Sequence, residues 1–278
     1  MPSIHATAIV DRGAELAEDV TIDAYAIVGG SVSIGAGTTI GSHSIIHGPT
    51  VIGANCTIGP AAYVGQDPQH LTFLSKPLEI RQQSWLVIGD NTIIREAASI
   101  HRSSKPGREN ATRIGNNCMI MGGAHVAHDC VLADHVTMAN GALLGGHCTI
   151  GARAFLGGAC GLHQFGRIGR LAMVAGNESI GRDVPPFAAM YHGGLKGYNA
   201  VGCRRAGISR DAITAIRKAY HCYHSNRTMT GVLAAIADAG IDTPEVREIL
   251  EFFKSTRRGI QPSVRVLNYL RSSAGEEE

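Results

Sequence analysis

Residues 114–138 read IGNNCMIMGGAHVAHDCVLADHVTM, and an aliphatic side chain returns at every sixth position of this stretch. The residues at these positions are Ile114, Ile120, Val126, Leu132 and Met138. A period of six matches neither the 3.6-residue turn of an α-helix nor the alternation of a single β-strand. A fixed period instead indicates a repeat architecture, in which each unit buries its apolar side chain against its neighbours.

The same period covers most of the first 180 residues, in three blocks at residues 4–64, 88–100 and 114–180. A glycine follows many of the aliphatic residues, as in Ile34-Gly35. We expect this glycine to ease a tight corner, because glycine enters positive φ without a Cβ clash. Short strands and corners, with three hexads to a coil, predict a mainly β, parallel β-helix. Its coils should stack at about the 4.8 Å spacing of strands.

Two segments interrupt the period with proline and charge, at about residues 65–86 and 102–112. We expect both to be loops extruded from the coils, and loops on a rigid scaffold commonly carry binding contacts. The period ends near residues 183–186, which read DVPP. The sequence thus predicts a solenoid over residues 1–190 and a small C-terminal α-helical domain over residues 191–278.

Within this C-terminal segment, apolar residues fall at helical spacing. One helix is predicted to begin at Ser209, a second to cover residues 230–239, and a third to begin at Thr243-Pro244. Serine and threonine favour the N-cap position of a helix, and proline is tolerated in its first turn.

Composition narrows the class of protein. The chain has 278 residues with a formal net charge of +2, whereas a nucleic-acid binder usually carries a clear basic excess. No apolar run of about 18 residues exists, so no membrane span is predicted. The N-terminus lacks the basic start and apolar block of a signal peptide, and we therefore expect a cytoplasmic location.

The hexad also predicts which side chains point inward: the aliphatic residue and the small residue four positions later. Five cysteines occupy the second position, which predicts interior fillers rather than disulfides or zinc ligands. They are Cys56, Cys118, Cys130, Cys148 and Cys160.

Four histidines avoid both inward positions and cluster on successive coils: His125, His128, His147 and His163. Asp129 lies 18 residues before His147, so the two side chains are predicted to stack one coil apart. A carboxylate beside an imidazole raises its basicity and fixes its tautomer, as a general base requires. Three histidines could instead bind zinc, as in a hexapeptide-repeat zinc hydratase. Acid–base chemistry is favoured, and no metal is predicted.

The motifs of this chain, in their order, resemble the UDP-N-acetylglucosamine O-acyltransferase family, which begins lipid A synthesis. The motifs that carry the resemblance are Ile100-His101-Arg102, AHVAHDC at 124–130, His163-Gln164-Phe165, DVPP at 183–186, Arg204-Arg205, AITAIR at 212–217 and FFKSTR at 252–257. The resemblance implies a left-handed β-helix and a homotrimer with active sites between adjacent solenoids. It also implies a 3-hydroxyacyl donor carried on acyl carrier protein and UDP-N-acetylglucosamine as the acceptor, with no cofactor.

The resemblance further implies a role for individual residues. His128 matches the general base that deprotonates the 3-hydroxyl of the sugar, and no covalent acyl-enzyme forms. Asp129 matches its supporting acid, and Gly146 matches the backbone N–H that binds the thioester oxyanion. Gly176 matches the residue that limits acyl length. The remaining matches are residues that bind the nucleotide sugar or the arm of the carrier protein: His125, His147, His163, Gln164, Asn199 and Arg205.

Two departures from the family pattern concern the acceptor. Gln69-His70-Leu71-Thr72 stands where the family usually has a QDLK-like run, and Val201 stands where it usually has a glutamate. A related acyltransferase acting on another UDP-sugar, such as a 3-amino analogue, is therefore an open alternative. Acyl length and the exact acceptor are not fixed by the sequence. Docking of the acidic carrier protein on basic residues of the C-terminal segment also stays open.

Overall fold

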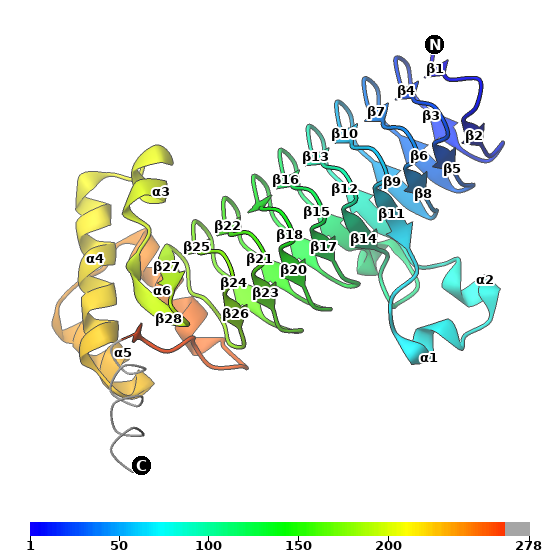
Figure 1. The fold of residues 1–278 in the computed structure, drawn as a ribbon. Helices are drawn as coiled ribbons and strands as arrows, with labels where there is room; N and C mark the ends of the chain where they lie inside the picture. The colour runs from blue at the N-terminus through cyan, green and yellow to red at the C-terminus, as the bar shows by residue number, and fades with distance from the viewer. Residues whose placement is uncertain (265–278) are drawn as a thin grey trace, which may run out of the picture.

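Short parallel strands wind into a three-sided prism, and a helical segment covers its C-terminal end (Figure 1). The computed structural model describes residues 1–264. Within this range each complete coil contributes one strand to each of three sheets. The named strands pair in parallel, except for the antiparallel pair β27–β28 at the end of the first sheet.

The first sheet contains β1 (Ser3–Ile4), β4 (Thr21–Ile22), β7 (Thr39–Ile40), β10 (Thr57–Ile58), β13 (Ile93–Ile94), β16 (Met119–Ile120), β19 (Thr137–Met138), β22 (Phe155–Leu156), β25 (Met173–Val174), β27 (Ala188–Tyr191) and β28 (Gly194–Tyr198). The second contains β2 (Ile9–Val10), β5 (Ile27–Val28), β8 (Ile45–Ile46), β11 (Tyr63–Gln66), β14 (Ser99–His101), β17 (His125–Val126), β20 (Leu143–Leu144), β23 (Gly161–Leu162) and β26 (Ser179–Ile180). The third contains β3 (Glu15–Leu16), β6 (Val32–Ile34), β9 (Thr50–Ile52), β12 (Leu86–Ile88), β15 (Thr112–Ile114), β18 (Val131–Leu132), β21 (Thr149–Ile150) and β24 (Arg167–Ile168).

The register between coils follows the hexad period. Ser3 pairs with Thr21, three hexads later. Where Tyr63 pairs with Ser99, and Ser99 with His125, the spacing is longer because the chain leaves the prism between these coils. The first excursion joins β11 to β12 and contains α1 (Leu71–Leu74) and α2 (Leu78–Arg81), which project from the prism (Figure 1). The second joins β14 to β15 and contains a 3₁₀ turn at Arg108–Asn110.

The predicted inward positions are confirmed beyond the first coil, whose Ile4 is 46% exposed at the open end of the prism. Val126 and Leu144, at the aliphatic position, are 0% and 1% exposed. The cysteines four positions after an aliphatic residue are also buried, and all seven cysteines are free thiols. Small residues at this position leave room for the large aliphatic chains, so the narrow interior closes without aromatic side chains.

The glycines after the aliphatic residues have a different role from the one predicted. Positive φ occurs mainly three positions after the aliphatic residue, at residues such as Asn55 and Asp129, and not at Gly35. A Cβ on Gly35 would lie 2.6 Å from the backbone of Gly53 in the next coil. Glycine is needed there because two backbones approach closely, so the prediction of positive φ was wrong. Gly65, which opens the first loop, is an exception with φ of 80°.

In the described part of the chain, four named helices follow the β27–β28 hairpin: α3 (Ala200–Arg205), α4 (Arg210–Ser225), α5 (Met229–Asp238) and α6 (Pro244–Lys254). The predicted starts at Ser209 and Thr243 are confirmed, because each side chain accepts a hydrogen bond from the backbone N–H three residues on. The hairpin and α3 were not predicted. The domain boundary at residue 190 stays a prediction, and residues 265–278 lie outside the described part of the chain.

The helices share the apolar core with the last coils. Tyr220 of α4 is buried, and its hydroxyl donates to the Pro186 carbonyl at 2.6 Å. Asp183, at the end of the solenoid, is 1% exposed and accepts hydrogen bonds from Arg167 and from Thr256. No helix within residues 1–264 has the length and apolar character needed to cross a membrane.

Candidate active site

The clustered polar residues lie on one edge of the prism, where the second sheet turns into the third. Asp129, His147 and Phe165 occupy equivalent corner positions of three successive coils, with φ of 60°, 62° and 63°. Aspartate tolerates this left-handed conformation better than most residues, and histidine is also enriched there. Because the corners stack in register, the side chains of these residues are held close together on a rigid frame.

His128 and Asp129 form the tightest polar contact of the cluster. His128 Nδ1 lies 2.6 Å from Asp129 Oδ2, whereas His147 Nε2 lies 3.5 Å from the same oxygen. The stacking of Asp129 near His147 agrees with the prediction, but His128 is the closer partner. Sequence neighbours on an extended strand point apart, yet here the left-handed corner at Asp129 turns its carboxylate back toward the preceding imidazole.

The Asp129 carboxylate is fixed by the second loop. Ser104 donates to it twice, from its backbone N–H at 3.0 Å and from its hydroxyl at 2.7 Å. The Asp129 N–H in turn donates to Thr112 Oγ1 at 2.8 Å. Burial by itself would raise the pKa of this carboxyl, but the hydrogen bonds from His128 and Ser104 hold the pKa below its ordinary value. Asp129 is therefore a carboxylate at neutral pH.

This hydrogen bond sets the tautomer of His128. A carboxylate can only accept, so His128 Nδ1 carries the hydrogen and Nε2 presents a lone pair. The His128 side chain is 12% exposed. A partly buried imidazole with an oriented carboxylate and a free ring nitrogen has the arrangement of a general base.

Gly146 and His147 form the floor beside His128. A Cβ on Gly146 would lie 2.7 Å from His128 Cε1 and 2.9 Å from Nε2, so only glycine leaves room for the ring in this position. The rings of His128 and His147 meet edge to face at 5.1 Å, and His147 stacks on Phe165 at 4.5 Å. Burial lowers the pKa of His147, which favours its neutral form.

His125 lies one strand earlier, at the edge of the cluster. Its Nδ1 is 2.8 Å from Ser99 Oγ of the preceding coil, and its ring meets His101 edge to face at 4.7 Å. Burial lowers the pKa of His125. Burial also lowers the pKa of His101, to about 4, and the neighbouring imidazoles of His125 and His128 add to this effect. Both rings are therefore neutral at physiological pH.

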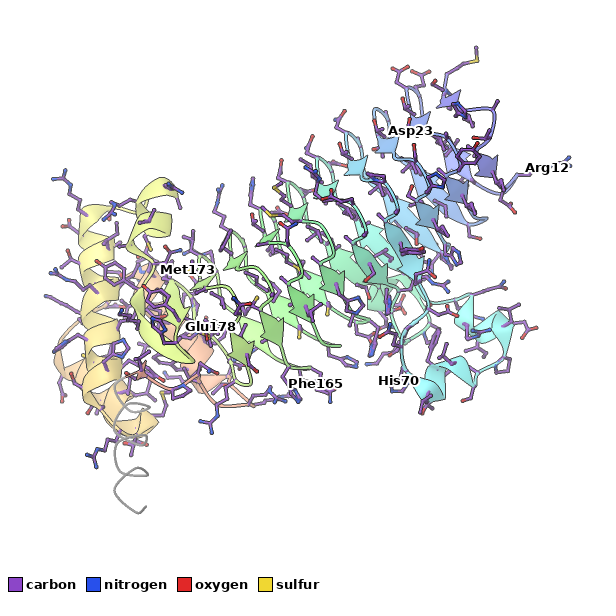
Figure 2. The ribbon with its side chains drawn as sticks, viewed as in Figure 1. Arg12, Asp23, His70, Phe165, Met173 and Glu178 are labelled. Atoms are coloured by element: carbon purple, nitrogen blue, oxygen red, sulfur yellow. The ribbon has the colours of Figure 1, made fainter. Side chains whose placement is uncertain are left out.

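The first loop supplies one wall. His70, on this loop, meets His128 edge to face at 5.7 Å, and Figure 2 shows His70 and Phe165 along the same edge of the molecule. Sequence reasoning placed His70 only in the altered acceptor run, and it did not place Ser104 or Phe165 in the site. Phe165 carries a signal, since it follows His147 by 18 residues. The period gives no such signal for His70 and Ser104, because inserted residues break the period that predicts stacking.

The structure does not bring all predicted residues together. His163 and Gln164 are exposed on the coil after His147. Asn199 caps α3 through Gly202 and donates to the Leu171 carbonyl at 2.9 Å. Arg205 is exposed at the end of α3, a helix that lies beyond the last coils (Figure 1), and Gly176 lies against Gly158.

His128, Asp129 and His147 also offer three potential metal ligands within 4.8 Å of one another. Ligand atoms around tetrahedral zinc lie about 3.3 Å apart, given bond lengths near 2.0 Å. The 2.6 Å contact between His128 and Asp129 is that of a hydrogen bond. The arrangement therefore suits proton transfer better than metal binding.

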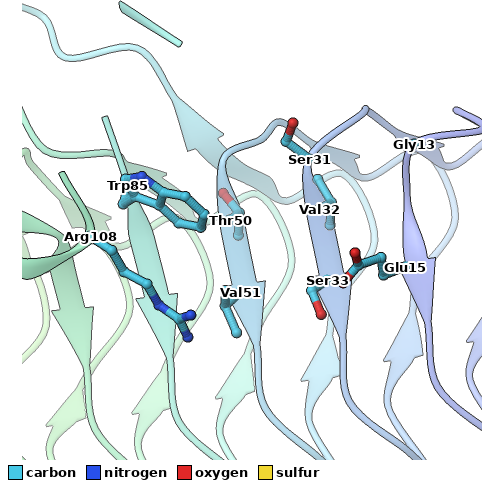
Figure 3. A pocket seen from close by; sticks show the side chains of 9 residues that line it. All are labelled: Gly13, Glu15, Ser31, Val32, Ser33, Thr50, Val51, Trp85 and Arg108. Atoms are coloured by element: carbon cyan, nitrogen blue, oxygen red, sulfur yellow. The ribbon is translucent and has the colours of Figure 1, made fainter. Parts of the chain in front are cut away.

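A separate hollow of about 380 Å³ lies on the outer face of the third sheet (Figure 3). Trp85 and Arg108 stand at one end of it, and Glu15 lies at the other. None of the residues that line it is a histidine, so it offers no imidazole base.

A prism of hexapeptide coils with an oriented histidine on one edge defines a hexapeptide-repeat transferase. The bacterial transferase hexapeptide model matches residues 13–48, 31–66 and 111–146. A second family model, described as UDP-N-acetylglucosamine O-acyltransferase domain 2, matches residues 183–261.

Relatives that are similar over most of the chain support the same class. An acyl-[acyl-carrier-protein]–UDP-N-acetylglucosamine O-acyltransferase of Paracidovorax citrulli is 45% identical over 267 residues, which cover 94% of this chain and 99% of the relative. A protein of the same name from an Anaeromyxobacter species is 37% identical, over 72% of this chain and 77% of its own. This chain therefore belongs to the acyl-[acyl-carrier-protein]–UDP-N-acetylglucosamine O-acyltransferase family.

Solved structures agree with this assignment. The UDP-N-acetylglucosamine acyltransferase of Campylobacter jejuni superposes with a TM-score of 0.83 at 31% identity, over 94% of this chain and 99% of the other. LpxA of Acinetobacter baumannii gives a TM-score of 0.83 at 37% identity, over 92% and 98% of the two chains. The hexapeptide repeats and these structures identify the solenoid as a left-handed parallel β-helix, as predicted.

Proposed function

We propose that this protein transfers a 3-hydroxyacyl chain from acyl carrier protein to the 3-hydroxyl of UDP-N-acetylglucosamine. Membership of the family supports this activity. The observation that carries it is the 2.6 Å contact between His128 Nδ1 and Asp129 Oδ2, which leaves His128 Nε2 free to accept a proton. The relatives favour this acyltransferase over the zinc hydratase and over a 3-amino acceptor.

The proposed reaction is a direct transfer. His128 Nε2 removes the proton of the sugar hydroxyl as the oxygen attacks the thioester carbon. Asp129 stabilises the imidazolium that forms, and the Gly146 N–H is proposed to donate to the thioester oxygen as it becomes negative. The attack forms a tetrahedral intermediate. Its collapse breaks the carbon–sulfur bond, and the imidazolium returns its proton to the leaving thiolate. No cysteine is needed as a nucleophile, and those of the solenoid are buried.

The acceptor and the donor are proposed to bind along the same edge. His125, His147, His163 and Gln164 lie on or beside the cluster and are proposed to contact the nucleotide sugar or the carrier arm. Asn199 and Arg205 are proposed to contact the nucleotide, with the Arg205 guanidinium suited to phosphate. Gly176 is proposed to limit the length of the acyl chain.

We propose a homotrimer, because it would let residues at the two separate places of one chain act in the same site. Asn199 and Arg205 lie at the C-terminal end of the prism, so they are proposed to reach the site of a neighbouring copy. The outer face of the second sheet carries exposed apolar side chains that a neighbour would cover, including Ile9, Tyr63 and Leu143, which are 64%, 45% and 49% exposed. The acidic carrier protein is proposed to dock on exposed basic residues of α3 and α4. The cytoplasmic location stays a prediction.

The test is a transfer assay with the His128→Ala variant. We expect this variant to lose at least about a hundredfold in kcat with its fold retained, because the side chain points out of the core. His135→Ala is the matched control, since His135 is an exposed corner histidine on another edge. UDP-N-acetylglucosamine and its 3-amino analogue are compared as acceptors, with hydroxyacyl carrier proteins of several lengths. Near-normal turnover by His128→Ala would refute the assignment of the base.

A further inference from the structure

The first loop, residues 66–85, is tied to the prism by a small cluster of charged residues. Asp67 lies at the start of this loop, Arg81 closes α2 near its end, and Arg102 follows β14 in the next coil. The Asp67 carboxylate accepts from both guanidinium groups: Arg81 Nη1 donates to Oδ2 at 2.7 Å, and Arg102 donates to Oδ1. One carboxylate therefore joins both ends of the loop to the coil below.

Arg102 is the anchor of this cluster. Its side chain is 6% exposed, compared with 26% for Arg81 and 28% for Asp67. One terminal nitrogen donates to the Gly48 carbonyl and the other to Asp67. Two acceptors in different directions require the planar fork of arginine, which the single ammonium of lysine does not reproduce.

The loop held in this way contacts the histidine cluster at two points. His70 Nδ1 accepts from the Phe73 N–H at 3.2 Å and caps α1, so its Nε2 carries the hydrogen, and its ring meets that of His128 at 5.7 Å. Lys76 Nζ lies 3.4 Å from the Ser104 carbonyl, and Ser104 donates to Asp129. Loop position is thus coupled to the surroundings of His128 and, more weakly, to the support of the base.

We propose that the Asp67–Arg81–Arg102 cluster is a positioning device that holds the first loop beside His128 and so completes the acceptor side of the site. This inference rests on the proposed function. None of the three residues contacts the reacting atoms, and each acts through the loop. The cluster therefore affects binding of the nucleotide sugar, while the acyl donor and the His128–Asp129 pair are left largely as they are.

The main test is Asp67→Ala, because Asp67 is the least buried of the three residues and the carboxylate that both guanidinium groups share. We expect the KM for the UDP-sugar to rise about tenfold or more, which corresponds to the loss of one charge-assisted contact. The kcat and the KM for acyl carrier protein should stay within about threefold of the parent. Arg102→Lys should give a similar rise. Asp134→Asn is the control, because Asp134 binds the Asn116 backbone on another edge of the prism.

Hydrogen exchange provides a readout that does not depend on activity. In Asp67→Ala, amides of residues 66–85 should exchange faster while those of β17 and β20 stay protected. An unchanged KM with unchanged loop exchange would overturn the proposal, as would a fall in kcat with equal rises in the KM of both substrates. Full activity of Arg102→Lys would refute the need for the guanidinium fork. If the parent protein transfers no acyl chain, the proposed function fails, and loop exchange still decides whether the cluster holds the loop.

Discussion

The contact between Gly146 and His128 makes a quantitative prediction about the Gly146→Ala variant. The added Cβ would lie 2.7 Å from His128 Cε1, 2.9 Å from Nε2 and 3.2 Å from Nδ1. Contacts this short force the imidazole to move away. Its 2.6 Å hydrogen bond to Asp129 is the contact that is lost when the ring rotates.

The expected loss follows from that hydrogen bond. A hydrogen bond to a charged group contributes about 1.5–3 kcal/mol, and each 1.4 kcal/mol is a factor of ten in rate. We therefore expect kcat to fall about 10- to 100-fold in Gly146→Ala. Alanine keeps the backbone N–H, so the proposed oxyanion donor is retained and the loss reports on the position of His128.

The assay measures acyl transfer to UDP-N-acetylglucosamine by Gly146→Ala, with Gly181→Ala as the control because a Cβ there meets nothing within 4 Å. A double-mutant cycle completes the test. If Gly146 acts by seating the imidazole, Gly146→Ala should cost little in a His128→Ala background. A rate close to that of the parent in the single variant would refute the reasoning, and so would a full additional loss in the double variant.

Three further predictions follow from the site and its surroundings. Asp129→Asn should lower kcat by about a hundredfold or more. The amide of asparagine can donate to His128 Nδ1, which places the proton on Nε2, the nitrogen that must act as base. A pH–rate profile like that of the parent would contradict this prediction. The pKa of His101 is lowered to about 4 in the folded protein. Between this pKa and the ordinary value of about 6.5, the unfolded chain binds a proton that the folded chain does not. About 2–3 kcal/mol of the free energy of unfolding should therefore be lost as the pH falls from 6.5 toward 4. Urea unfolding at pH 7 and pH 4.5 measures this loss, which should be smaller in His101→Phe; an equal loss in that variant would exclude His101 as its source. Gly176→Met should shift the preferred donor to shorter acyl chains, because its side chain would fill space beside the Gly158 carbonyl, from which an added Cβ would lie 3.0 Å. An unchanged preference would remove Gly176 from the acyl site.

Much of the fold could be predicted because one period encodes it. The aliphatic residue and the small residue four positions later are buried beyond the first coil of the solenoid, as at Val126 and Cys130. The prediction failed where a residue's role depends on a contact with the next coil and not on its own hexad. Gly35 was assigned positive φ, yet the structure uses glycine there for the approach of the next coil. The hairpin β27–β28 was missed because its residues carry neither the hexad nor a helical period.

The candidate site was predictable only in part, for a related reason. Outward residues of equivalent position stack 18 residues apart, so His147 could be placed beside Asp129 in advance. The closer pairing of Asp129 with His128 was implied by the family resemblance alone, because the hexad period does not show the left-handed corner on which it depends. The period could not place Ser104 or His70 beside the cluster either, since residues inserted between coils have no register with the rest of the chain.

The sequence by itself determined the solenoid, the direction of its side chains and the edge on which the histidines gather, because a strict period fixes the position of every residue relative to its neighbours one coil away. Only the tertiary structure decided how closely each imidazole approaches the carboxylate and which loop residues support it. The 2.6 Å contact of His128 with Asp129 depends on the backbone angles of the corner at Asp129, and the contact of Ser104 with Asp129 comes from a segment that leaves the repeat. The period therefore placed the histidines on one edge of the prism. Folding of the loops onto that edge completed the candidate site.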